Sequence, residues 1–180
     1  AVERPDIAPR RVALSSRVQL MVAPALPGDH VLLILGNDEA QVYSLSQGRA
    51  VGRIPSKTRS PDINSIALNA VGTCAAVAVD RFSSGSIDVW DTLNGKLLAR
   101  LEPGAKARNV EFVEFIGNAM LATYPGKDGD HSATIWDLET GDAVRTLVTQ
   151  HPLTKGVAAA SPGGKYLAVA NYLPNTLTIL

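Results

Sequence analysis

A short motif recurs four times along the chain at a nearly constant spacing, and this repeat limits the possible folds more than any other feature. The motif occurs as Gln41-Val42-Tyr43, Asp88-Val89-Trp90, Thr134-Ile135-Trp136 and Thr178-Ile179-Leu180. Its central residues are 47, 46 and 44 positions apart. A second marker, a turn glycine, occurs at Gly28, Gly72, Gly117 and Gly163, with spacings of 44, 45 and 46 residues. A fixed period of about 40 to 50 residues indicates an architecture of repeated structural units.

Each repeat has the composition of four short β-strands. In the second repeat, runs rich in β-branched and aromatic residues predict strands at Ile63–Leu68, Cys74–Val79, Ser86–Trp90 and Lys96–Leu101. The turn after the third strand contains Gly48, Gly95 and Gly141 in the first three repeats, where glycine supplies the positive φ of a tight hairpin. Four strands per repeat form one blade of a propeller. We therefore predict an all-β protein, a β-propeller of about four four-stranded blades.

The predicted repeats occupy residues 18–55, 62–102, 108–148 and 153–180, after an N-terminal segment, 1–17, that contains a candidate closing strand at Arg11–Leu14. The fourth repeat lacks the outer strand that the other repeats have. End blades left open would expose apolar surface, at a cost of roughly 25 cal/mol per Å². We therefore expect the ring to be completed by blades of a longer chain or by a homodimer that exchanges the closing strand.

Two of the third strands, Ile87-Asp88-Val89-Trp90-Asp91 and the segment Thr134–Gly141, resemble the WD-repeat family. The resemblance extends from about residue 18 to residue 180, although the Gly-His pair of that family is absent from three repeats. The fourth repeat is also similar to repeats of bacterial lactonase-like propellers. Resemblance to WD-repeat proteins implies a noncatalytic scaffold that presents rim loops to a peptide or protein partner. The lactonase-like repeat keeps open an alternative, a small-molecule hydrolase with a site beside the central channel.

The aromatic and acidic residues of the repeated motif have structural explanations. Trp90 and Trp136 occupy matching positions, and we expect both to anchor neighbouring blades. Asp91 and Asp137 follow them at the start of a turn, where a carboxylate accepts hydrogen bonds from nearby backbone N–H groups. These four residues are therefore predicted to hold the fold, and no catalytic residue is predicted.

A basic arc is the candidate partner-binding surface. Lys57 and Arg59 lie in one connection between repeats, and Lys106 and Arg108 lie 49 residues later in the next connection. Equivalent connections share one rim, so these cations would face the same side of the propeller. They are either ordinary solvated side chains or a docking surface for an acidic peptide or phosphate group.

The most concentrated group of possible metal ligands is Asp128, Asp130 and His131. It lacks the further oxygen ligands of a calcium loop and the convergent nitrogen or sulfur ligands of a zinc site. The group is therefore interpreted as a polar hairpin loop, and no metal or other cofactor is expected.

Charge and hydropathy exclude several partners. The chain has 17 basic and 17 acidic residues, so no net field attracts nucleic acid or an anionic membrane. No apolar run approaches the roughly 18 to 20 residues of a spanning helix. We therefore expect a soluble protein without a nucleic-acid or membrane partner. Its compartment is left open, with a cytoplasmic location favoured.

Overall fold

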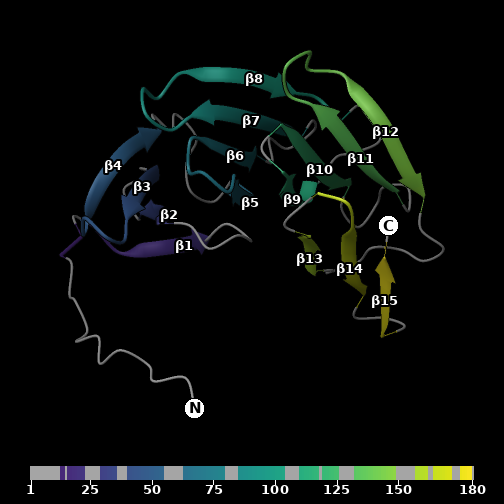
Figure 1. Cartoon of the computed structure of the whole chain (residues 1–180), viewed down its shortest axis with the longest axis horizontal. Helices are drawn as coiled ribbons and strands as arrows, with labels where there is room; N and C mark the ends of the chain where they lie inside the picture. The colour runs from purple at the N-terminus through teal and green to yellow at the C-terminus, as the bar shows by residue number, and fades with distance from the viewer. Residues whose placement is uncertain are drawn as a thin grey trace.

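The protein is built from antiparallel β-sheets (Figure 1). The computed structural model describes residues 13–14, 16–22, 29–35, 40–54, 63–79, 85–103, 110–117, 119–125, 132–148, 157–161, 164–171 and 175–179. Within these ranges there are 15 strands and no helix. The prediction of an all-β protein is therefore confirmed.

Four sheets follow one another along the chain, each made of consecutive strands. The first contains β1 (Val18–Val22), β2 (His30–Leu35), β3 (Ala40–Ser44) and β4 (Arg49–Ile54). The second contains β5 (Ile63–Leu68), β6 (Cys74–Val79), β7 (Ser86–Asp91) and β8 (Leu97–Leu101). The third contains β9 (Val110–Ile116), β10 (Met120–Pro125), β11 (Ser132–Asp137) and β12 (Ala143–Val148). The fourth contains β13 (Val157–Ala160), β14 (Leu167–Asn171) and β15 (Thr176–Ile179).

The strands predicted for the second repeat are confirmed to within one residue at each end. β7 extends to Asp91 because the N–H of Asp91 donates a 2.8 Å hydrogen bond to the carbonyl of Lys96, which closes the hairpin. The turn glycines Gly48, Gly95 and Gly141 have φ values of 66°, 67° and 78°, as the sequence predicted. Each of the three donates its N–H to the carbonyl four residues earlier. The same local chemistry therefore forms the same turn in three sheets.

The sheets fan out in an arc (Figure 1). Their first strands, β1, β5, β9 and β13, lie nearest the middle of the arc, and β4, β8 and β12 lie at its outer side. Successive first strands are in contact, β1 with β5, β5 with β9 and β9 with β13. Each sheet therefore packs face to face on the next one.

The core consists of one apolar cluster between each pair of successive sheets. Side chains alternate between the two faces of a strand. In β6, Ala75, Val77 and Val79 accordingly pack on the first sheet, whereas Ala76 and Ala78 pack on the third. Because both faces of this strand are covered, its sequence is continuously apolar.

The fourth sheet is covered on one face. Ala158, Ala160, Leu167 and Val169 are buried against residues of the third sheet. On the opposite face Leu177 and Ile179 are each 65% exposed. Only the face toward the third sheet therefore contributes to the core.

Of the candidate closing strand, Arg11 and Val12 lie outside the described residues, and Ala13 and Leu14 are not in a strand. The described part of the chain contains no helix that is long and apolar enough to cross a membrane.

Candidate functional site

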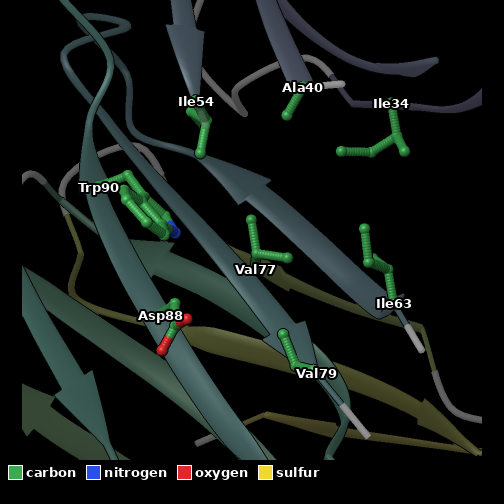
Figure 2. A pocket seen from close by; sticks show the side chains of 8 residues that line it. All are labelled: Ile34, Ala40, Ile54, Ile63, Val77, Val79, Asp88 and Trp90. Atoms are coloured by element: carbon green, nitrogen blue, oxygen red, sulfur yellow. The ribbon is translucent and has the colours of Figure 1, made fainter. Parts of the chain in front are cut away.

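Both tryptophans of the repeated motif lie at packing surfaces between sheets. Trp90, at the end of β7, packs on the cluster that joins the first and second sheets. Trp136, at the end of β11, is 8% exposed and belongs to the cluster that joins the second and third sheets. Figure 2 shows the indole of Trp90 on the same strand as Asp88, with Ile54 of the first sheet nearby. The cavity left there has a volume of about 10 Å³, which is room for one water molecule at most.

Asp88 is buried at this cavity and is fully paired. Its two carboxylate oxygens accept hydrogen bonds from Nε and a terminal nitrogen of Arg100, at 2.7 and 2.9 Å. This ion pair raises the pKa of the Arg100 guanidinium. A carboxylate held in this way links β7 to β8 and stabilises their hairpin.

Asp91 and Asp137 cap the turns that follow them. The carboxylate of Asp91 accepts hydrogen bonds from the N–H groups of Leu93 and Asn94, at 2.8 and 3.3 Å. The carboxylate of Asp137 accepts from Glu139 at 2.8 Å and from Thr140 at 3.4 Å. These contacts are local to each hairpin.

A groove of about 330 Å³ opens between the third and fourth sheets. Its lining combines apolar residues of both sheets with two cations: Ile116, Ile135, Val144, Arg145, Leu147, Gly164, Lys165, Tyr166 and Leu167. The volume is within the range of about 300 to 1,000 Å³ that is usual for ligand-binding pockets. The combination of apolar surface and two cations suits a ligand that is partly apolar and partly negatively charged.

Strand alternation places the residues of β12 in the groove. Arg145 pairs with Ile135 and Leu147 pairs with Ala133, so the two β12 side chains are on the face toward the fourth sheet. The register shifts between Ile135 and Trp136, and this irregularity places Val144 at the groove as well. Val144 is 51% exposed. One side of the groove is therefore an apolar strand that carries a guanidinium group.

The opposite side of the groove is the turn between β13 and β14. Gly164 adopts a φ of 66°, and a Cβ atom there would lie 3.1 Å from Cγ2 of Ile116. Lys165 and Tyr166 follow it, and the Lys165 ammonium lies 5.0 Å from the centroid of the Tyr166 ring. The glycine thus lets the turn approach the third sheet closely. The described residues of the groove lining carry two positive charges and no negative charge.

Glu114 lies on the inner strand β9, between Phe112 and Ile116, and faces the fourth sheet. Its carboxylate accepts a hydrogen bond from the N–H of Ala160, which lowers its pKa, but burial has the larger effect. Burial raises the pKa of Glu114 to about 7. Glu114 is therefore an ionisable side chain at the contact between the third and fourth sheets, which also form the groove.

The other site residues singled out from the sequence lie outside the described residues. These are the basic arc, Lys57, Arg59, Lys106 and Arg108, and the polar loop residues Asp128, Asp130 and His131. Among the residues that the structure does describe, no three His, Cys, Asp or Glu side chains are grouped closely enough to hold a metal ion.

Sequence reasoning missed the groove, although the repeat contained a signal for it. Strand pairing places Gly52 opposite Val42, Ala99 opposite Val89 and Arg145 opposite Ile135. The first two sheets therefore have a small residue at this position, and the third has an arginine. An alignment of the fourth strands would have marked Arg145 as the exception.

Neither a protein-family model nor a curated protein gives a significant match to this chain.

Proposed function

We propose that the four sheets are blades of a WD-like β-propeller, and that the protein is a noncatalytic scaffold for a protein partner. In this proposal an acidic peptide segment of the partner binds in the groove between the third and fourth sheets. The arc of sheets, with every first strand on its inner side, supports the propeller assignment. The repeated turn glycines and the contacts between successive first strands support it further.

The chemistry of the groove supports a binding role most directly. Arg145 and Lys165 flank an apolar floor, and no carboxylate among the lining residues that the structure describes neutralises them. Such a surface complements a segment that carries both apolar and acidic side chains. Among the lining residues that the structure describes, the polar side chains are those of Arg145, Lys165 and Tyr166. The charge and apolar surface of the groove therefore support a binding role.

A charge-reversal experiment tests this role. Peptides selected from a random display library on the immobilised protein are expected to contain Asp or Glu. Their affinity should fall at least about tenfold for the double variant R145E/K165E, because two attractive contacts become repulsive. The control double variant R49E/K96E makes the same change of charge at two exposed positions, one in β4 and one in the turn before β8.

Fluorescence anisotropy with the synthesised peptides measures the affinities. Selection of no acidic peptide, or equal loss of affinity in both double variants, would refute the assignment of the groove as the binding site.

A further inference from the structure

The turn between β7 and β8 contains the single Asn-Gly dipeptide of the chain, Asn94-Gly95. In such a dipeptide the backbone nitrogen of the glycine can attack the side-chain amide, because no Cβ atom hinders its approach. The nitrogen forms a bond to Cγ of the asparagine, and the bond from Cγ to Nδ2 breaks. Nδ2 takes up the proton of the glycine N–H and leaves as ammonia. Water then opens the succinimide ring and produces aspartate or isoaspartate.

Three equivalent hairpin turns carry a different residue before their positive-φ glycine: Gln47, Asn94 and Thr140. Glutamine forms the corresponding larger ring less readily, and threonine has no side-chain amide. Asn94 is exposed, so water can reach it. Of these three turns, the one between β7 and β8 therefore has the side chain that is best able to undergo this reaction.

Hydrogen bonds hold both reacting groups of this turn. Nδ2 of Asn94 donates to Oδ2 of Asp91 at 2.7 Å, and Oδ1 of Asn94 accepts from the N–H of Lys96 at 2.8 Å. The attacking nitrogen is also engaged, because the N–H of Gly95 donates to the carbonyl of Asp91 at 3.0 Å. The amide can turn toward the nitrogen of Gly95 only if the bonds from its two ends break.

The products of the reaction fit this turn poorly. Conversion to aspartate replaces the donor Nδ2 by a carboxylate oxygen at a position 2.7 Å from Oδ2 of Asp91. Two carboxylates at this separation repel each other. Isoaspartate also lengthens the backbone of the turn, which would disturb the 2.8 Å bond from the N–H of Asp91 to the carbonyl of Lys96. Conversion of Asn94 is therefore expected to weaken the hairpin of β7 and β8.

We propose that Asn94 is a modification site, at which the Asp91 carboxylate holds back succinimide formation in the folded protein. The two oxygens of Asp91 have separate roles. Oδ1 caps the turn by accepting from the N–H groups of Leu93 and Asn94, and Oδ2 holds the amide. Asp137 caps its own turn with Oδ1 in the same way, but Thr140, at the position of Asn94, has no amide to hold.

A serine at position 91 separates the two roles. Ser44 occupies the equivalent position in the first sheet, and its Oγ accepts the N–H of Gln47 at 3.1 Å. Asp91→Ser can therefore cap the turn, but it has no second oxygen for the amide of Asn94. The matched control is Asp137→Ser, which makes the same substitution in the third sheet.

Conversion of Asn94 is followed by mass spectrometry of the tryptic peptide that ends at Lys96, during incubation at mildly alkaline pH. The folded wild-type protein is expected to convert at least about tenfold more slowly than the same protein unfolded in guanidinium chloride. Folded Asp91→Ser should convert at least about tenfold faster than the folded wild-type protein, since a hydrogen bond to a charged group contributes at least the free energy that corresponds to a factor of ten. Asp137→Ser should convert at the wild-type rate. Circular dichroism shows whether both variants are folded.

Each other outcome would overturn the proposal. Equal rates in the folded and unfolded wild-type protein, or no conversion in either, would show that Asn94 is not a site restrained by the fold. A slow rate in folded Asp91→Ser would show that the hairpin protects Asn94 without the carboxylate. Equal acceleration in both serine variants would attribute the effect to a general loss of stability.

Discussion

The variant Gly52→Ala is expected to have a free energy of unfolding about 2 to 3 kcal/mol below that of the wild-type protein. The added Cβ would lie 2.1 Å from the carbonyl oxygen of Thr92 and 2.9 Å from its carbonyl carbon. Thr92 is completely buried, and its hydroxyl donates a 2.6 Å hydrogen bond to the carbonyl of Gly72. The backbone of Thr92 cannot move away without losing this hydrogen bond. The first and second sheets must therefore move apart to accommodate the added methyl group.

Urea denaturation of the wild-type protein and the variant measures this loss. The matched control is Gly141→Ala, because Gly141 has a φ of 78° but nothing within 4 Å of an added Cβ. Backbone strain alone should cost the control about 1 kcal/mol. A smaller loss in Gly52→Ala than in Gly141→Ala would contradict the steric explanation.

The free energy of unfolding is also expected to fall as the pH rises from about 4.5 to about 7, because of Glu114. Its pKa is about 7 in the folded protein, against an ordinary value of 4.5. Between these values the folded state binds more protons than the unfolded state, so stability decreases with pH. The stabilising contribution is complete below pH 4.5 and is lost as the pH passes 7. Allowing for partial solvent screening, the change is on the order of 2 kcal/mol.

The variant Glu114→Gln should remove this pH dependence. A glutamine keeps an oxygen that can accept the N–H of Ala160 and carries no charge between the third and fourth sheets. The variant is therefore expected to be more stable than the wild-type protein at pH 8 and similar to it at pH 4.5. Chemical denaturation at several pH values gives both profiles. Glu139→Gln, at an exposed turn position, is the control. If the free energy of unfolding of Glu114→Gln depends on pH as steeply as that of the wild-type protein, the effect does not come from Glu114.

Local patterns in the sequence were sufficient to predict the strands and their turns. Alternation of side chains and β-branched composition act over a few residues, so the ends of β5 and β6 were predicted correctly. The positive φ of Gly95 was predicted for the same reason, since a tight hairpin requires it wherever it occurs. The structure thus confirms an all-β protein made of small antiparallel sheets. The resemblance to WD-repeat propellers remains a prediction.

The position of the groove, the steric constraint at Gly52 and the pKa of Glu114 depend on which faces of neighbouring sheets pack together. Arg145 and Lys165 are 20 residues apart in the sequence and belong to different sheets, and no local pattern joins them. The need for glycine at position 52 comes from a carbonyl 40 residues away. The raised pKa of Glu114 comes from burial against the fourth sheet. Alternation along a strand determines which side chains share a face of the sheet. Packing between sheets determines which of those side chains are buried and which line a groove.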